Sequence, residues 1–439
     1  MIHAPSFHPA FPRSDEFHLE INGQHVDVLR SDVASFAICA VVDEPAHVVV
    51  RSPGERVTRA GIHPMRLGVE VSVAEDGTVT FVLDRPQPVL LRPFGLPDLY
   101  LLLHDKADVP PSDSSILRIP SGQIVERPTV DLDGYAGLHI EAGAVLRSRL
   151  FVRNKRDVRV TGQGIFDGSF DLHTPDHSIP AIVTEGCPGA LIEDITVINP
   201  RGWMIVVAAS DGTIVRNTRQ LGKVISSDGI DVLGSSGVVI EDCFISNNDD
   251  CVAIKAFELG RNGLHTIRVD GRQNVHDVLV RRCVLANGPA GNAMEIGHEL
   301  TVDRVRDICF EDIDVLSVHG HGAVFSIHNG DRATVENITY ENIRIEHCYD
   351  KLIDFRVMRS RFNTDTERGH IRNVALRDIH WTSTPYNPGY TVSIIGGWDA
   401  DHPIENVTLK NVRIDGKPVT SLDDLDLFTR HARDIKVMA

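Results

Sequence analysis

A short pattern of alternating residues recurs from residue 191 to residue 414. Each copy runs apolar-x-apolar, then a polar residue followed by Asp, Asn or Arg, then apolar-x-apolar. Three consecutive copies begin at residues 278, 308 and 338, thirty residues apart, and the spacing is looser elsewhere. A unit this short cannot bury its apolar face alone, so the copies must stack into one elongated core. The copies are LIEDITV (191–197), VVIEDCFI (238–245), VLVRRCVL (278–285), ICFEDIDV (308–315), ITYENIRI (338–345), VALRDIHW (374–381) and VTLKNVRI (407–414).

The copies predict short β-strands rather than helices. Apolar and polar residues alternate with a period of two, β-branched residues are frequent, and helical periodicity is absent. The recurring Asn or Asp stands where the chain bends between two strands. A β-propeller is the competing repeat fold, but each of its blades needs about 40–45 residues for four antiparallel strands. Thirty-residue copies are too short for a blade, so the sequence predicts an all-β chain built as a right-handed parallel β-helix.

The first hundred residues have a different character. Period-2 stretches such as AHVVVRS (46–52), LGVEVSV (67–73) and VTFVLD (79–84) are separated by turn residues, which predicts a small antiparallel β-sandwich over residues 1–105. Residues 106–115, with two adjacent prolines and a Ser-rich end, are interpreted as a linker. The β-helix is then expected over residues 116–439, with a terminal cap at 421–435 that shields the last coil.

Composition restricts the partners of this chain. A net charge of −17 and a pI near 5.6 disfavour capture of nucleic acid or of an anionic membrane. The N-terminus has no basic and apolar leader pattern and no apolar run reaches membrane-span length, so a cytoplasmic location is expected. Seven cysteines without ligand spacing predict reduced, buried thiols. Cys243 and Cys283 occupy equivalent inward positions in successive copies and are expected to stack in the core.

Three aspartates form the constellation that points to chemistry. Asp228 lies in SSDGIDV, and Asp249 and Asp250 lie in NNDDCVAIK, 21 residues further along, which is the length of a short coil. The solenoid should therefore stack Asp228 close to the pair. Carboxylates that are close together repel, and repulsion raises at least one pKa. Hydrolysis of a glycosidic bond needs one protonated and one ionised carboxyl group. Turn-lining aspartates without a function, and a calcium site, are the alternatives.

An ordered series of motifs resembles the glycoside hydrolase family 28 polygalacturonases. The series is VTGQGIFDG (160–168), INPRGWMIVV (198–207), SSDGIDV (226–232), SGVVIEDCFISNNDDCVAIK (236–255), AMEIG (293–297) and VENITYENIRI (335–345). The resemblance covers roughly residues 116–415. It implies an inverting hydrolase in which Asp249 is the general acid while Asp228 and Asp250 activate water. No cofactor is expected, and no metal, because a bound cation would oppose the protonated carboxyl group that hydrolysis needs.

Two motifs depart from the family pattern. Asn292 stands where the family has the His of Gly-His-Gly, and Ser326-Ile327-His328 replaces Arg-Ile-Lys, which binds a galacturonate carboxylate. Loss of this Arg and Lys makes a neutral glycan such as an α-glucan the expected substrate. The related family 49, the dextranase and isopullulanase group, also has three aspartates on a β-helix and an N-terminal β-sandwich. A polygalacturonase, a polysaccharide lyase and a non-enzymatic carbohydrate-binding β-helix are the alternatives.

Further side chains are expected to bind an oligosaccharide along the outer face of the coils. Aligning the inward Ile and Val residues predicts three outward columns: Asp228, Asp250 and Asn292; Asp231, Glu295, Ser326 and Asp354; and Lys255, His328 and Arg356. The segment 256–275, inserted just after the aspartate pair, is expected to close one end of the cleft and to favour exo-action. The predicted substrate-binding residues are Trp203, Asp231, Lys255, Asn292, Glu295, His298, His328, Arg356 and Trp398.

Overall fold

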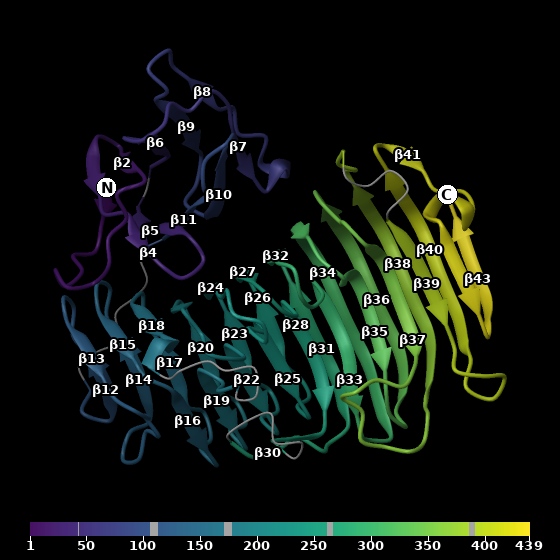
Figure 1. The fold of residues 1–439 in the computed structure, drawn as a ribbon. Coiled ribbons are helices and arrows are strands. Elements are labelled where there is room, and N and C mark those ends of the chain that lie inside the picture. Colours follow the sequence, from purple (N-terminus) through teal and green to yellow (C-terminus); the bar gives the residue numbers. More distant parts are fainter. Residues whose placement is uncertain (43, 106–112, 171–177, 261–266, 386–390) are drawn as a thin grey trace.

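A computed structural model describes residues 1–42, 44–105, 113–170, 178–260, 267–385 and 391–439. Figure 1 shows two parts: a set of strands at the N-terminal end rises above a long row of stacked strands that continues to the C-terminus. Only three short 3₁₀ helices occur in the described residues: η1 (Met65–Leu67), η2 (Gly168–Phe170) and η3 (Asp423–Leu425). None of them is long and apolar enough to span a membrane.

Two sheets form the N-terminal part, and their apolar faces share one core that includes Leu19, Val48 and Leu101. One expectation was wrong here: the sandwich is not purely antiparallel, because Ser35–Val41 pairs in parallel with Leu99–His104. The strands of the first sheet are β1 (Ile2–His3), β4 (Leu29–Arg30), β5 (Ser35–Val41), β7 (Ala60–His63), β10 (Pro88–Pro93) and β11 (Leu99–His104). Those of the second are β2 (His18–Ile21), β3 (Gln24–Val26), β6 (Ala46–Arg51), β8 (Ser72–Val73) and β9 (Val79–Leu83).

From Ile116 onward the chain winds as a right-handed parallel β-helix, as predicted. A ten-stranded parallel sheet forms one wall, and inward side chains such as Ile254, Ile296 and Ile327 stack through the coils in a single apolar core. Each inward side chain contributes about 1.5–3 kcal/mol by leaving water. The strands of this wall are β16 (Leu150–Arg153), β19 (Ile182–Glu185), β22 (Ile205–Ala208), β25 (Ile230–Leu233), β28 (Val252–Ala256), β33 (Met294–Leu300), β35 (Ala323–Asn329), β37 (Lys351–Val357), β39 (Val392–Gly396) and β42 (Leu427–Arg430).

A twenty-stranded sheet forms the remaining walls. Its members are β12 (Ile116–Ile119), β13 (Ile124–Glu126), β14 (Gly137–Ile140), β15 (Val145–Arg147), β17 (Arg159–Thr161), β18 (Ile165–Asp167), β20 (Leu191–Glu193), β21 (Thr196–Ile198), β23 (Ile214–Arg216), β24 (Arg219–Leu221), β26 (Val239–Glu241), β27 (Phe244–Asn247), β31 (Val275–Arg281), β32 (Val284–Asn287), β34 (Arg304–Val318), β36 (Thr334–Ile345), β38 (His370–Trp381), β40 (Ile404–Ile414), β41 (Lys417–Pro418) and β43 (Ala432–Met438). The segment 421–435, predicted as a cap, contributes η3, β42 and most of β43 to the last coil.

The recurring Asn or Asp of the sequence pattern marks a bend in the left-handed region. Asp194 has φ of 65° between β20 and β21, and Asn342 has φ of 54° within β36. Asn and Asp tolerate this conformation better than other residues with a side chain. The side chains also pair from coil to coil: Asn217 donates to Asp194, and Asn342 donates to Asp312 at 3.1 Å. The repeated residue therefore fixes the bend and the register together.

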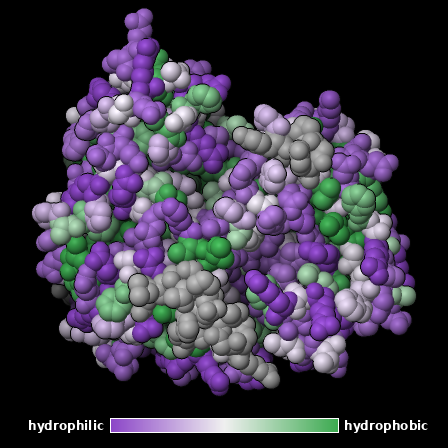
Figure 2. Space-filling view, in the orientation of Figure 1, coloured by the Kyte–Doolittle hydropathy of each residue, from purple (hydrophilic) through white to green (hydrophobic). Residues whose placement is uncertain are grey.

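The N-terminal sheets pack against the outside of the β-helix. Phe36 and Leu102 share an apolar cluster with Ile198 and Phe244, which point outward from β21 and β27. Polar contacts border the cluster, including Tyr100 Oη to Ser246 Oγ at 2.9 Å. Figure 2 shows a mostly hydrophilic face whose outline is notched between the N-terminal sheets and the C-terminal coils. Ser246 lies three residues before Asp249, on the strand that leads to the aspartate pair.

Several smaller expectations concern segments and thiols. None of the seven cysteines forms a disulfide bond in the described residues; Cys309 is half-buried and the other six, including Cys243 and Cys283, are buried. Residues 106–112, most of the expected linker, lie outside the described residues. The expected insertion at 256–275 is described except for residues 261–266. It contains a two-stranded ribbon of β29 (Glu258–Leu259) and β30 (Val269–Asp270), whose apolar side chains pack on the outer face of β19, β22 and β25.

Candidate active site

The three aspartates meet at the turns that lead into β25 and β28. One carboxylate oxygen from each of Asp228, Asp249 and Asp250 lies within 4.8 Å of the others. The ladder places Asp228 beside Asp250 and Asp250 beside Asn292, because Gly229 N donates to Asp250 O and Cys251 N donates to Asn292 O, both at 2.8 Å. The first column therefore has the expected register. Asp228 and Asp250 are buried, whereas Asp249 is partly exposed.

Close backbone packing shapes these turns. Gly291 has φ of +71°, and a Cβ on it would lie 2.2 Å from the carbonyl carbon of Asp249. Only glycine avoids that overlap while keeping a left-handed conformation. From the other side, Asn247 Nδ2 donates to the carbonyls of Ser227 and Asp250, both at 2.8 Å. The coil after the pair and the end of β27 together hold the two aspartate turns in contact.

Each carboxyl group of the trio has its own hydrogen-bond partners. Asp249 Oδ2 accepts from Ser226 N at 2.9 Å and its Oδ1 accepts from Asp250 N at 3.0 Å, and no ion pair of Asp249 occurs among the described residues. Asp250 Oδ1 accepts from both N and Nδ2 of Asn292 at 2.8 Å, which favours its charged form. Asp228 Oδ2 accepts from Lys255 Nζ at 2.8 Å. The three aspartates therefore differ in charge environment despite their proximity.

Lys255 is the buried cation of the site. Its ammonium group also donates to Asp231 Oδ1 at 2.8 Å and lies 3.9 Å from the centre of the Trp203 ring. Trp203 is buried and contacts Phe257 edge to face. Trp203 thus covers Lys255 with its ring face, a cation–π contact that the sequence did not suggest. Trp203 was predicted to bind substrate, but the ring face that contacts the ammonium group is not available to a sugar.

Burial and mutual repulsion set the protonation of the trio. Burial raises the pKa of Asp249, and the charge of Asp228 raises it further, to about 7. Burial likewise raises the pKa of Asp250 well above its usual range, with added repulsion from Glu295 and Asp249. For Asp228, burial raises the pKa but Lys255 opposes the shift. The trio titrates as a coupled set in which Lys255 gives Asp228 the most direct support for ionisation, whereas burial and repulsion raise the pKa of both Asp249 and Asp250.

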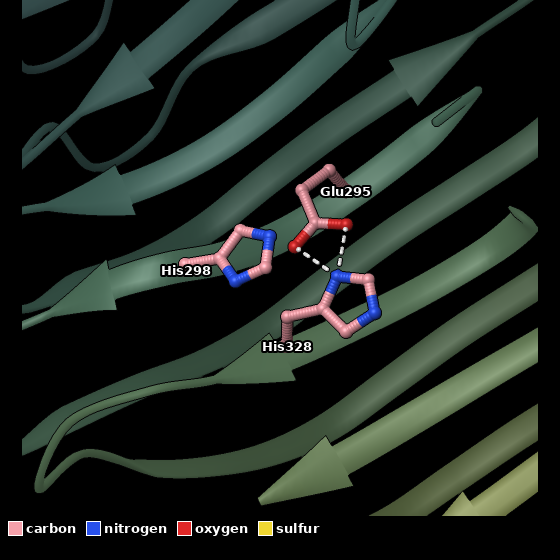
Figure 3. A group of neighbouring side chains, drawn as sticks. All are labelled: Glu295, His298 and His328. Carbon is pink, nitrogen blue, oxygen red and sulfur yellow. Dashed lines mark hydrogen bonds and ion pairs between the residues drawn. The ribbon is translucent and has the colours of Figure 1, made fainter. Parts of the chain in front are cut away.

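The second and third columns lie along the same outer face, over β33, β35 and β37. The ladder pairs Glu295 with Ser326 and Ser326 with Asp354, and it pairs His328 with Arg356. Figure 3 shows His328 Nδ1 facing both oxygens of Glu295, at 3.1 and 3.2 Å. On the other side of the ring, His328 Nε2 lies 3.2 Å from Asp354 Oδ2. These side chains form a connected floor of alternating charge.

Neighbouring carboxylates keep His328 protonated. Burial alone would lower the pKa of His328, but Glu295 and Asp354 raise it to about 9. His328 in turn overcomes the effect of burial on Glu295 and lowers the pKa of that carboxyl group to about 2. Arg356 donates to both oxygens of Asp354, at 2.5 and 2.7 Å. Every cation of this floor therefore already has an acidic partner.

Two predicted binding residues occupy different settings. His298 stacks on His328 with ring centroids 4.6 Å apart and also contacts Phe362 at 5.3 Å, so it belongs to the floor. Trp398 is 42% exposed and lies near Arg368, with 5.5 Å between the guanidinium carbon and the ring centre. β39 ends at Gly396, which pairs with Arg356. Trp398 is therefore beyond the end of the floor, and no described contact joins it to the other predicted residues.

Sequence reasoning missed two acidic residues beside the site. Glu299 is buried on β33, and burial raises its pKa to about 7. Asp331 accepts from the backbone N–H of Leu300, Thr364 and Asp365, and so fixes the segment that carries Phe362. The only signal for Glu299 was its position next to His298 in strand β33. Asp331 gave no signal, because its partners are 31 to 34 residues away.

The model of one protein family, glycosyl hydrolases family 28, matches residues 158–427, which is more than half of the chain. This chain belongs to glycosyl hydrolases family 28. Among curated relatives, the probable exopolygalacturonase X of Neosartorya fischeri is 25% identical over 275 residues, covering 58% of this chain and 60% of the relative. The exopolygalacturonase of Cochliobolus carbonum is 26% identical over 288 residues, covering 58% and 61%. The chain spans about 60% of the length of these relatives.

Solved structures agree with the fold of this family 28 chain. Dex49A from Penicillium minioluteum aligns with a TM-score of 0.67 at 10% identity, covering 99% of this chain and 96% of that one. An exopolygalacturonase from Thermotoga maritima aligns with a TM-score of 0.55 at 16% identity, covering 73% and 84%. The first alignment includes the N-terminal sheets as well as the β-helix. At these identities the likeness concerns the fold alone.

Within family 28, the two motif departures have structural consequences. Asn292, in place of the expected His, donates twice to Asp250 and accepts from Ala323 N at 2.8 Å, so it fixes one aspartate of the trio. Ser326 replaces the Arg of the family pattern and His328 replaces its Lys. The floor therefore has one cation at these positions, the protonated ring of His328, where the family pattern has two. Arg356, one coil further, is the nearest guanidinium in register.

Proposed function

We propose that this protein hydrolyses a glycosidic bond of an oligogalacturonide and releases residues from one chain end. The observation that supports hydrolysis is the trio itself: three carboxyl groups with oxygens within 4.8 Å of one another, one with a pKa of about 7 and one hydrogen-bonded to Lys255. The names of the family 28 relatives support a galacturonide substrate. Lys255, His328 and Arg356 supply positive charge along the outer face that would bind the galacturonide.

The expected cytoplasmic location stays a prediction.

In the proposed step, Asp249 donates its proton to the leaving glycosidic oxygen as the bond to the anomeric carbon breaks. A water molecule attacks that carbon from the opposite side and gives its proton to Asp228 or Asp250. Inverting enzymes usually separate acid and base by about 6.5–9.5 Å, whereas the oxygens of this trio lie within 4.8 Å of one another. Inversion is therefore proposed on the family resemblance and on the presence of two bases for one water.

A neutral glycan is the second candidate substrate. Asn292 and Ser326 are uncharged, and His328 and Arg356 already pair with Glu295 and Asp354. A uronate carboxylate would have to share these cations, whereas sugar hydroxyl groups could bond to the whole alternating floor. Arg356 nevertheless retains 34% side-chain exposure, which allows it to reach a ligand.

A substrate panel separates these candidates. The protein is incubated with galacturonide and isomaltose-series oligosaccharides of two to six units, and the first product is followed by NMR of its anomeric proton. We expect monomer release from galacturonides, with the anomer opposite to that of the cleaved bond. Cleavage of the glucan series alone would favour the neutral substrate, and random internal cleavage would exclude exo-action. Retention of the anomer would exclude inversion, and an unsaturated product absorbing in the near ultraviolet would indicate a lyase.

The pH dependence of kcat provides a second prediction. Asp249 must carry a proton to act as the acid, and its pKa is raised to about 7. We therefore expect kcat to fall as pH rises through about 7, as the proton is lost. The measurement is initial rate against pH at saturating substrate, with circular dichroism recorded over the same range to exclude unfolding. A rate that stays constant to pH 9 would contradict Asp249 as the acid.

A further inference from the structure

Three side chains on the floor offer ligand atoms of the types that transition metals bind. Glu295, His298 and His328 each provide one such atom, and these atoms lie within 4.8 Å of one another. Figure 3 shows the carboxylate of Glu295 and both rings converging above β33 and β35. None of the three has a part in the proton transfers assigned to the trio. The cluster is therefore a separate group of ligands on the same outer face of the β-helix.

His298 gives an independent indication that the cluster accepts a ligand. Its Nδ1 atom is buried and has no hydrogen-bond partner among the described residues. An unsatisfied buried polar atom of this kind costs about 1–3 kcal/mol. A neutral imidazole with an unpaired nitrogen is the form that binds a metal ion.

We propose that Glu295, His298 and His328 form a binding site for a divalent transition metal such as Zn²⁺, with a water molecule as a fourth ligand. Zinc prefers four ligands drawn from imidazole nitrogen, carboxylate oxygen and thiolate, at about 2.0–2.2 Å for nitrogen and oxygen. Glu295 Oε2 and His328 Nδ1 are already 3.1 Å apart, close to the separation of two ligands on one zinc ion. The aspartate trio offers oxygen atoms alone, which suit calcium or magnesium instead.

Binding requires one side-chain movement. The rings of His298 and His328 stack at an interplanar angle of 18°. The lone pairs of their nitrogens lie in these nearly parallel ring planes, so they do not converge on one ion as the rings stand. Rotation of His298 brings a nitrogen toward Glu295, and its other ring contact, with Phe362, is apolar. The ion replaces the proton shared between Glu295 and His328 and draws His328 away from Asp354.

Titration calorimetry with ZnCl₂ on the full chain, previously treated with a chelator and dialysed, tests the site. We expect one equivalent of zinc to bind, and Co²⁺ in its place to give the visible absorption of a four-coordinate ion. His298→Ala and Glu295→Gln should each weaken binding by about 100-fold, the upper end of what loss of even an outer-shell partner costs. Two variants are the matched controls: Asp250→Asn, in the trio, and His370→Ala. His370 lies on β38 and its ring stacks on that of His402. Both variants should bind zinc as the parent does.

The zinc titration measures metal binding and not hydrolysis. Its result is therefore independent of the result of the substrate panel and of the proposed function. Absence of zinc binding by the parent chain would overturn the site. So would binding that survives His298→Ala but is lost in Asp250→Asn, which would place the ion at the trio. Binding lost in His370→Ala alone would place it on the surface pair.

Discussion

Replacement of Asp249 by asparagine is expected to lower kcat by about 10²- to 10⁴-fold, the contribution that general acid–base catalysis makes. Asparagine has the same shape and its oxygen can still accept from Ser226 N, so the turn should keep its conformation. The amide cannot donate a proton to a leaving oxygen as an acid does. The effect should therefore appear in kcat, with little change in KM or in the unfolding midpoint.

A matched control for this variant is Asp242→Asn. Asp242 lies in the same coil, at an exposed left-handed bend where asparagine is equally suitable, and it pairs with Arg282 on the surface. Its replacement should leave kcat unchanged. Glu299→Gln is the informative comparison, because burial raises the pKa of Glu299 to about 7 as well. If Asp249→Asn kept its activity and Glu299→Gln lost it, the acid would be Glu299.

Replacement of Lys255 by methionine is expected to lower the apparent free energy of unfolding by about 3–5 kcal/mol, the usual cost of leaving a buried charge without its partner. The variant leaves two carboxyl groups, Asp228 and Asp231, buried without a cation. Asp231 Oδ2 already has no hydrogen-bond partner among the described residues. Methionine fills a similar volume under Trp203, so the effect reports charge and not a cavity. Urea unfolding followed by circular dichroism measures it.

A second substitution distinguishes the electrostatic cause from a packing cause. Adding Asp231→Asn to Lys255→Met removes one of the two uncompensated charges and should recover part of the lost stability. Attraction to Asp228 and Asp231 raises the pKa of Lys255 well above its usual range in spite of burial, whereas burial raises the pKa of Asp228 and raises that of Asp231 well above its usual range. An unchanged unfolding curve for Lys255→Met would mean that both aspartates are protonated in the native state, and would contradict this arrangement.

The repeat alone was enough to predict the β-helix. Its information is local: the alternation of apolar residues assigns each side chain to the inside or the outside, and the Asp or Asn at each bend, such as Asp194 or Asn342, adopts a conformation that few other residues tolerate. Stacking of equal units then carries outward residues into columns. For this reason Asp228, Asp250 and Asn292 could be aligned from the sequence before any distance was known.

Contacts between distant segments were not predictable in this way. The parallel pairing of β5 with β11 joins residues more than sixty positions apart, and nothing in either strand selects a parallel over an antiparallel neighbour. The docking of Tyr100 beside Ser246 depends on two apolar surfaces that fit each other. Trp203 was expected to face a sugar, yet it covers Lys255, because the insertion at Phe257 packs its ring against that strand.

The sequence by itself determined the coil, the register and the three aspartates, since each follows from short-range pattern and from a fixed repeat length. The tertiary structure decided which of those groups carries charge. Burial, the distance to Lys255 and the hydrogen bonds from Asn292 set the pKa of each aspartate, and these quantities depend on atoms contributed by several coils. The orphaned nitrogen of His298 likewise arises only when β33, β35 and the segment around Phe362 come together, because whether an atom finds a partner is a property of the packed surroundings.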